Sequence, residues 1–375
     1  MKVPTSAASL AFALLFAIGA SSVSAAKTFV YVSAAEDGNI DAYTMDPGTG
    51  ALTPIGKFEA AKIVMPMAVS PNKKHLYAVV RSQPLRVLTY AIEANGALTQ
   101  KAAAPLPDSM PYVSTDRTGR WLFTASYGGD KLAVSPIGED GLVTAEAVQV
   151  IPTGRNAHSI LADRSNKYVY ACTLGANQVL QFTFDAKAGK LTPNDPPAVS
   201  PVPGNGPRHM ALSPDDKYLY VINELSGHVT QYAIDPAKGT LTLVDTISSV
   251  PPEAGLPWGK PQVPGTPPPR AIWAADIGMT PDGKFLYSTE RITSKIALFT
   301  VAPGTGKLAY VTNFATEAQP RGIRVDPHGR YLIASGEKSD HLSVYKIDQS
   351  SGKLGEPSRY PVGNDANWVE IVEAE

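Results

Sequence analysis

The chain has 375 residues, of which 43% are apolar and 18% are charged, and its formal net charge at pH 7 is −1. This composition is ordinary for a soluble globular protein, and the length allows one large domain or two to three small ones. The near-zero net charge and the lack of long Lys or Arg runs exclude the broad basic surface by which proteins bind nucleic acids or anionic membranes.

The first residues have the layout of a secretory signal peptide. The charged start Met1-Lys2 precedes a small-and-apolar run over residues 7–20, and Val23-Ser24-Ala25 resembles a cleavage site. A membrane anchor is the alternative, but the run is shorter than the roughly 20 residues that span a bilayer, and no later segment qualifies as a span. We therefore expect residues 1–25 to be removed, with residues 26–375 forming a periplasmic or secreted protein.

One short strand pattern recurs seven times along the rest of the chain. Consecutive centres of the pattern are 46 to 50 residues apart, except for one interval of 67 residues. A second pattern, in which alternating apolar residues lead to Gly and Leu, follows each copy. Alternation with a period of two, interrupted by Gly, Pro and Asp, is typical of short antiparallel strands. The seven centres are Tyr31, Tyr77, Phe123, Tyr170, Tyr220, Tyr287 and Ile333.

Repeats of this size predict an all-β fold, a single seven-bladed β-propeller of four-stranded antiparallel blades. Most units begin with an inner strand that the first unit lacks, and the segment 368–372 at the chain end is expected to complete blade one and close the ring. A closed ring has no free sheet edge, so a monomer is expected. The long interval holds a Pro-rich insert, residues 251–269, interpreted either as a rigid surface loop or as a lid over the channel mouth.

Charged side chains gather where the inner strands begin and the second strands end. In an antiparallel blade these two points lie at the same rim of the propeller, so the residues should converge. Blades two and three are expected to contribute less to this group of side chains, through Arg81 and Tyr127. The opposite rim carries only sequences that are typical of turns. The converging residues are His158, Arg208, His209, Asp276 and Arg321 at strand starts, and Asn223-Glu224, Glu290-Arg291 and Gly336-Glu337 at strand ends.

Guanidinium groups beside a carboxylate and an imidazole suit an anionic or oxygen-rich small ligand. Arg208, Arg291 and Arg321 could hold a carboxylate or phosphate through paired donors, and an arginine could stabilise the oxyanion formed at an ester carbonyl. Glu224 and His158 would then supply general acid and base.

Other chemistries fit the sequence less well. No G-x-S-x-G, H-E-x-x-H or Cys-pair motif is present, and the six histidines are scattered, so neither a serine hydrolase nor a transition-metal site is predicted. A calcium site built from carboxylates and backbone oxygens stays open. We expect no cofactor.

These residues resemble the seven-bladed propeller lactonases, typified by bacterial 6-phosphogluconolactonase and related to the fungal carboxymuconate lactonizing enzymes. The resemblance covers essentially the whole mature chain, and it is carried mainly by Gly206-Pro207-Arg208-His209 followed by Asn223-Glu224, and by Pro320-Arg321-Gly322. It implies that His158, Arg208 and Glu224 act in catalysis, with a further arginine, Arg291 or Arg321, holding the acid.

The chain departs from this family at two positions. Glu290 stands before Arg291 where the family usually has Asn, and it could neutralise that arginine. Asp276 stands where Glu is usual. With His209, Arg291, Arg321 and Glu337, Asp276 is expected to bind substrate.

Three functional hypotheses follow. In the first, Glu224 activates water to attack a sugar-acid or related lactone in the periplasm, an arginine stabilises the oxyanion and His158 protonates the leaving oxygen, or the acid and base roles are exchanged. The second is the reverse chemistry, lactonization of a muconate-like diacid at the same site. The third is a propeller without catalysis that binds a cell-envelope ligand or a protein partner. The expected ligand is thus a small lactone or an anionic sugar acid, whether phosphorylated or not.

Overall fold

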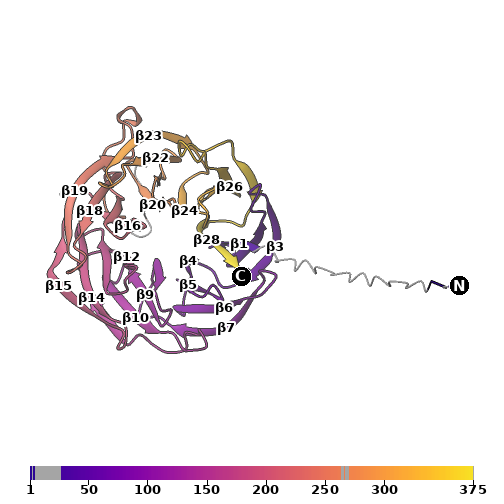
Figure 1. Ribbon diagram of the computed structural model, residues 1–375. Coiled ribbons are helices and arrows are strands. Elements are labelled where there is room, and N and C mark those ends of the chain that lie inside the picture. Colours follow the sequence, from indigo (N-terminus) through magenta and orange to yellow (C-terminus); the bar gives the residue numbers. More distant parts are fainter. Residues whose placement is uncertain (2, 5–26, 263–265, 267–269, 375) are drawn as a thin grey trace.

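The structure is a computed structural model that describes residues 1, 3–4, 27–262, 266 and 270–374. The described chain folds into seven four-stranded antiparallel sheets arranged in a ring around a central opening (Figure 1). Its one helical element is a single 3₁₀ turn, η1 (Pro252–Ala254). The predicted all-β seven-bladed propeller is therefore confirmed, whereas nearly all of the predicted signal peptide lies outside the described residues.

The first four blades use consecutive strands, apart from one inner strand. Blade one contains β1 (Lys27–Ala34), β2 (Asn39–Met45), β3 (Leu52–Glu59) and the inner strand β28 (Ala366–Ala374). Blade two contains β4 (Val64–Val69), β5 (His75–Val80), β6 (Arg86–Ile92) and β7 (Leu98–Pro105). Blade three contains β8 (Tyr112–Thr115), β9 (Trp121–Ser126), β10 (Lys131–Pro136) and β11 (Gln149–Pro152). Blade four contains β12 (Ala157–Ala162), β13 (Tyr168–Thr173), β14 (Gln178–Asp185) and β15 (Lys190–Val199).

The remaining three blades follow the same order from the axis outward. Blade five contains β16 (Pro207–Leu212), β17 (Tyr218–Asn223), β18 (His228–Ile234) and β19 (Leu241–Ser248). Blade six contains β20 (Ala274–Met279), β21 (Phe285–Glu290), β22 (Lys295–Val301) and β23 (Leu308–Ala315). Blade seven contains β24 (Pro320–Val325), β25 (Tyr331–Gly336), β26 (His341–Lys346) and β27 (Ser358–Pro361).

The C-terminal strand closes the ring. β28 pairs antiparallel with β1 from Lys27, opposite Ala374, to Ala34, opposite Ala366. The segment predicted from the sequence, residues 368–372, lies inside this strand. The backbone groups along the inner edge of β1 are thereby paired, and blade one is joined to the end of the chain.

The two parts of the sequence repeat meet across neighbouring blades. Five of the seven repeated centres are tyrosines whose buried hydroxyls each donate a hydrogen bond to a glycine carbonyl in the outer hairpin of the next blade. These glycines have positive φ, which favours glycine at the turn. The aromatic centre and the Gly-Leu pattern are therefore halves of one contact between blades. The pairs are Tyr31–Gly96, Tyr77–Gly141, Tyr170–Gly239, Tyr220–Gly306 and Tyr287–Gly352, at 2.7 to 3.0 Å.

The hydrophobic core is divided among the interfaces between blades. Seven clusters of buried residues are present, and each joins the facing sheets of two adjacent blades, as where Tyr31 of β1 packs with Met67 of β4. Because every sheet packs on both faces, the second strands are buried almost throughout. In the described part of the chain, no helix has the length and apolarity needed to cross a membrane.

The Pro-rich insert follows β19, and its described part forms hydrogen bonds with the propeller rim. Within its described part, the backbone N–H of Gly259 donates to the carbonyl of Leu225 at 2.7 Å, and the N–H of Gln262 donates to the Tyr127 hydroxyl at 3.0 Å. The described part of the insert is thus bonded to blades three and five. Residues 263–265 and 267–269 lie outside the described residues, and the lid remains a prediction.

Candidate active site

β-bulges occur where six of the inner strands begin, and four of these strands belong to blades four to seven. The pairing of β12, β16, β20 and β24 with their second strands shifts register around His158, Arg208, Asp276 and Arg321, respectively. A bulge leaves its extra residue out of the ladder and changes the direction of its side chain. The same irregularity therefore recurs in blades four to seven and affects four of the residues selected from the sequence.

Three further candidates directly follow the second strands of blades five to seven. Glu224 follows β17, Arg291 follows β21 and Glu337 follows β25. Strand starts and strand ends meet at one rim, as predicted. The structure brings together, in one group of side chains around the axis, the eight residues predicted to act in catalysis or to bind substrate: His158, Arg208, His209, Glu224, Asp276, Arg291, Arg321 and Glu337.

The centre of this group is the carboxylate of Glu224. Its Oε2 atom accepts hydrogen bonds from Nε of Arg208 and Nη2 of Arg291, each at 2.8 Å. All three side chains are at most 4% exposed, so both ion pairs are buried. Burial, and then the charges of neighbouring arginines, lowers the pKa of Arg208 to about 9. This carboxylate therefore joins an arginine of its own blade to an arginine of the next blade through charge-assisted hydrogen bonds.

Arg291 is oriented by blade six as well as by Glu224. Its guanidinium lies 3.5 Å from the ring centroid of Trp273, and Nε donates to the Trp273 carbonyl at 3.0 Å. Nη2 also donates to the carbonyl of Ala274 at 3.1 Å. Stacking and hydrogen bonding together leave this arginine one orientation.

Glu290 does not neutralise Arg291, contrary to the expectation from the sequence. Its carboxylate accepts hydrogen bonds from the backbone N–H groups of Trp273, Ile292 and Thr293 and from the Thr293 hydroxyl, at 2.6 to 3.1 Å. These bonds cap the turn after β21. Because Glu290 turns toward backbone donors, Arg291 is left to pair with Glu224.

His209 contacts Arg208 on one side and Asp276 on the other. Nδ1 of His209 is 2.8 Å from Oδ1 of Asp276, and its Nε2 is 3.2 Å from Nη1 of Arg208. Burial, and then the Arg208 charge, lowers the pKa of His209 to about 4, so its contact with Asp276 is a hydrogen bond from a neutral ring. Burial alone would raise the pKa of Asp276, but the bond from His209 holds it below its usual range. Both residues line a small inner cavity of about 50 Å³, and direct substrate contact by them remains a prediction.

His158 lies between aromatic rings. Its ring packs edge-on against Tyr127 and His209, with centroids 5.7 and 5.2 Å away. Burial, followed by the charge of Arg208, holds the pKa of His158 well below its usual range. The imidazole is therefore neutral at pH 7, and its N–H can donate a hydrogen bond without an additional proton.

Arg321 and Glu337 form a third ion pair on the blade-seven side. Nη1 of Arg321 lies 2.9 Å from Oε1 of Glu337. Burial would raise the pKa of Glu337, but the charges of Arg321 and Arg291 hold it below its usual range. The carboxylate is therefore ionised at neutral pH.

A cavity of about 140 Å³ opens among these groups. Three predicted residues, Glu224, Arg291 and Arg321, contribute to its wall. So do Arg81 and Tyr127, whose contribution was expected to be milder, and sequence reasoning missed Trp273 and Gln262. Trp273 directly precedes the inner strand β20, and this position at a strand start could have been recognised in the sequence. Gln262 lies in the insert, where no sequence pattern marks it.

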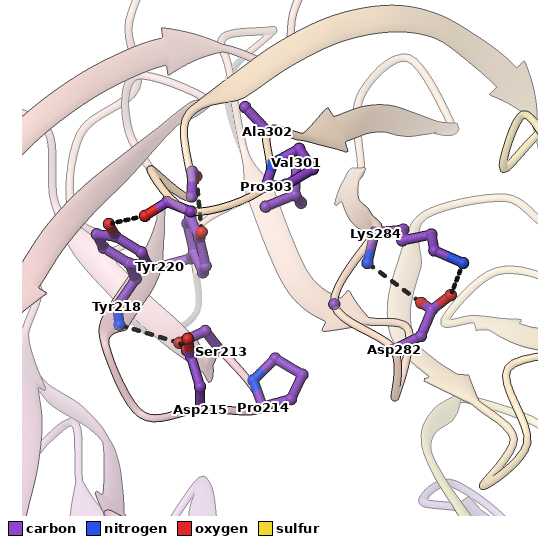
Figure 2. A pocket seen from close by; sticks show the side chains of 13 residues that line it. Ser213, Pro214, Asp215, Tyr218, Tyr220, Asp282, Lys284, Val301, Ala302 and Pro303 are labelled. Carbon is purple, nitrogen blue, oxygen red and sulfur yellow. Dashed lines mark hydrogen bonds and ion pairs between the residues drawn. The ribbon is translucent and has the colours of Figure 1, made fainter.

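The opposite rim has a larger hollow, but its polar groups pair with one another. This space of about 360 Å³ lies between blades five and six. Figure 2 shows the side chains that line it, among them Ser213 and Asp215 from one turn and Asp282 and Lys284 from another. Lys284 pairs with Asp282 at 3.0 Å, and Tyr218 donates to the Gly304 carbonyl. These are the contacts of ordinary turns, in keeping with the turn chemistry predicted for this rim.

Across the described ranges, no three His, Cys, Asp or Glu side chains are grouped as ligands of a metal ion would be.

Comparison with known proteins identifies relatives along nearly the whole chain. Residues 29–371 match the model of the family "Lactonase, 7-bladed beta-propeller". The 6-phosphogluconolactonase of Serratia proteamaculans is 42% identical over 92% of this chain and 99% of its own, and that of Pectobacterium carotovorum is 38% identical over 92% and 98%. The solved periplasmic gluconolactonase of Pseudomonas aeruginosa superposes with a TM-score of 0.82 at 26% identity, covering 94% of this chain and 100% of that one.

Proposed function

The chain belongs to the family of seven-bladed β-propeller lactonases, and from this premise we propose that it is an exported enzyme that hydrolyses a sugar-acid lactone. The resemblance inferred from the sequence is confirmed, and with it the class of enzyme, a lactonase acting on a carboxylic ester. Export and the identity of the lactone are the proposed parts.

The position of Glu224 carries the proposed mechanism. Its carboxylate lies in the cavity wall, and its Oε2 is occupied by two arginines, whereas Oε1 has no hydrogen-bonding partner among the described residues. In the proposal, Oε1 accepts a proton from the water molecule that attacks the lactone carbonyl. Arg291, which also lines the cavity, stabilises the negative charge that develops on the carbonyl oxygen.

The second half of the reaction opens the ring. When the bond between the carbonyl carbon and the ring oxygen breaks, Glu224 returns its proton to the leaving oxygen, and the product is an open hydroxy acid. Because burial keeps His158 neutral, we assign it as a hydrogen-bond donor to that oxygen rather than as an imidazolium acid. This assignment refines the sequence hypothesis, in which His158 delivered the proton itself.

Two observations support an exported enzyme and leave phosphorylation of the substrate open. The N-terminal residues have the charged, apolar and small-residue layout of a signal peptide. The matching Pseudomonas aeruginosa structure is described as a periplasmic gluconolactonase, whereas the curated relatives are named for a phosphorylated lactone. A neutral aldonolactone and its phosphorylated counterpart are therefore the first substrates to compare.

The reaction is tested with the mature protein, residues 26–375. Lactone opening releases a proton, so turnover of glucono-1,5-lactone and 6-phosphoglucono-1,5-lactone can be followed in a weakly buffered indicator assay against the spontaneous rate. Rate enhancement for either lactone supports the proposal. No enhancement, combined with lactonization of a muconate-like diacid, would favour the reverse chemistry, and no turnover in either direction would favour a binding propeller.

Export is tested separately. The full chain is expressed in a Gram-negative host, and the periplasmic fraction is analysed by intact-protein mass spectrometry. We expect a mature chain beginning at residue 26. A cytoplasmic protein that keeps its first residues would contradict export without affecting the proposed reaction.

A further inference from the structure

Tyr127 has in blade three the position that Glu224 has in blade five. It directly follows the second strand β9, as Glu224 follows β17, and both residues line the cavity of the site. The other strand-end residues of the same wall, Arg81 and Arg291, are charged. Tyr127 is thus the neutral member of this set, and the proposed mechanism gives it no role.

Three contacts hold Tyr127 in place, one for each part of the residue. Its backbone carbonyl accepts a hydrogen bond from Nδ2 of Asn156, which lies just before blade four, at 3.0 Å. Its ring packs edge-on against His158, with the ring centroids 5.7 Å apart. Its hydroxyl accepts a hydrogen bond from the backbone N–H of Gln262, in the Pro-rich insert, at 3.0 Å. The phenol is therefore oriented by the protein itself.

The hydroxyl of Tyr127 keeps a proton that it can donate. A phenolic oxygen both donates and accepts, and the bond from Gln262 uses only its capacity to accept. No described residue accepts a hydrogen bond from this hydroxyl. Burial, and then the charge of Glu224, raises the pKa of Tyr127 to about 12, so the proton is retained at neutral pH.

The cavity is too small to separate Tyr127 from the proposed reaction centre. Its volume of about 140 Å³ is shared with Glu224 and Arg291, which act on the lactone carbonyl in the proposed mechanism. The carbonyl and ring oxygens of a lactone are hydrogen-bond acceptors, and negative charge develops on them as the ring opens. A neutral donor in this wall therefore suits the same part of the substrate.

We propose that the Tyr127 hydroxyl donates a hydrogen bond to a lactone oxygen beside the reacting carbon, and that the Pro-rich insert orients this donor through the backbone N–H of Gln262. The proposal rests on the proposed lactonase function and deepens it. Tyr127 contacts the substrate, whereas Gln262 is a positioning residue that acts through Tyr127. The insert thus contributes to catalysis by a fixed hydrogen bond to blade three, without a movement.

The alternative is that the Tyr127 hydroxyl only attaches the insert to blade three. Tyr127→Phe removes the donor and the acceptor together, whereas Gln262→Pro removes only the backbone N–H that the hydroxyl accepts. Gln262→Ala is the matched control for the proline, because it also loses the side chain but keeps the N–H. Tyr218→Phe removes a hydroxyl from the opposite rim and should leave activity unchanged.

The first test compares kcat/KM of the mature protein for the lactone that the wild type hydrolyses faster, glucono-1,5-lactone or its 6-phosphate. If the hydroxyl only attaches the insert, Tyr127→Phe and Gln262→Pro break the same bond and lose equal activity. We expect Tyr127→Phe to lose roughly tenfold more, the value of one hydrogen bond. Gln262→Pro should in turn be less active than Gln262→Ala. Equal losses in Tyr127→Phe and Gln262→Pro would overturn the proposal.

The second test replaces Tyr127 by 3-fluorotyrosine, which changes its two hydrogen bonds in opposite senses. Fluorine makes the phenol a stronger donor and a weaker acceptor. A donor to the substrate should therefore keep kcat/KM at or above the wild-type value, whereas an attachment that only accepts from Gln262 should weaken. The assay is run at pH 6.5, where the raised pKa of the phenol keeps it protonated. A value below that of the wild type would contradict the donor role.

A binding experiment separates failure of this proposal from failure of the proposed function. If the wild type hydrolyses no lactone, the proposed function fails, and isothermal titration with gluconate and 6-phosphogluconate, the ring-opened products, tests Tyr127 alone. Binding that is roughly tenfold weaker in Tyr127→Phe than in Gln262→Pro supports the donor. Equal binding to both variants, or no binding of either product to the wild type, overturns it. If hydrolysis is observed but both variants lose equal activity, the lactonase function stands and this proposal fails.

Discussion

Oε2 of Glu224 lies 2.8 Å from Nε of Arg208, and this ion pair is almost completely buried at the centre of the propeller rim. The same oxygen also accepts from Arg291, which comes from the next blade. One carboxylate therefore holds two blades together and orients the two cations beside the cavity. Its removal should affect both stability and catalysis.

We expect Glu224→Gln to lower kcat for lactone hydrolysis by at least about 100-fold, because the amide cannot accept the proton of the attacking water. It should also lower the free energy of unfolding by roughly 3 kcal/mol, since two buried guanidiniums lose their counter-charge. Activity is measured well below the unfolding temperature, and stability by urea titration. A variant that is folded and keeps activity within tenfold would contradict the role of Glu224 as base.

Substitutions of His158 distinguish a neutral hydrogen-bond donor from an imidazolium acid. Gln keeps an N–H donor, so His158→Gln should retain more activity than His158→Ala, which should lose roughly 100-fold. The wild-type kcat should show no decline near pH 6.5, because the depressed pKa of His158 keeps the ring neutral there. His328→Gln, on the exposed surface, is the control. Equal losses in both His158 variants, with a pH profile that falls above 6.5, would restore the imidazolium role.

Stability should fall as the pH is lowered from about 6.5 to about 4 because of His209. Its pKa is about 4 in the folded state, below the ordinary histidine value, so in this interval the unfolded chain binds the proton and the folded chain does not. The contribution of His209 to the free energy of unfolding is fully present above about pH 6.5. It is lost progressively as the pH falls to about 4, by about 3 kcal/mol in total. Urea unfolding at several pH values should show a flatter profile for His209→Gln than for the wild type. Parallel profiles would refute this origin of the pH dependence.

A substitution of Glu290 tests whether this residue caps the turn after β21 or neutralises the charge of Arg291. Because its carboxylate holds the turn that positions Arg291, Glu290→Ala should lower the free energy of unfolding by about 1–3 kcal/mol and reduce kcat/KM. If Glu290 instead neutralised Arg291, its removal would increase activity. Thermal unfolding and lactonase assays on both proteins decide between the two. Glu356→Ala, at an exposed carboxylate, should change neither quantity.

The closing strand should be required for cooperative folding. Ending the chain at Asp365 removes β28 and with it the eight-residue pairing to β1. Blade one would then expose an unpaired inner edge to the channel, and we expect either aggregation or a clearly lower urea midpoint with a broader transition. An unchanged midpoint would show that the ring holds together without this strand.

Much of the fold could be predicted because the repeat is local. The alternation, the mostly aromatic centres and the Gly-Leu pattern each lie within a few residues, and their spacing indicates seven similar units, one of them lengthened by the Pro-rich insert. Even the closure by residues 368–372 followed from counting the strands of each unit. The rim of the site was also predictable, because strand starts and strand ends must meet in an antiparallel blade.

The sequence by itself therefore determined the propeller, its closure and the set of polar residues that converge on one rim. Only the tertiary structure decided how these groups pair: Glu224 with arginines of two blades, Glu290 with backbone donors, and Arg81 with Ser109 and Met65. The reason is that strand patterns depend on neighbours in the chain, whereas the partner of a charge depends on distances between residues remote in sequence. Those distances are set by the bulges and by the packing of one blade against the next.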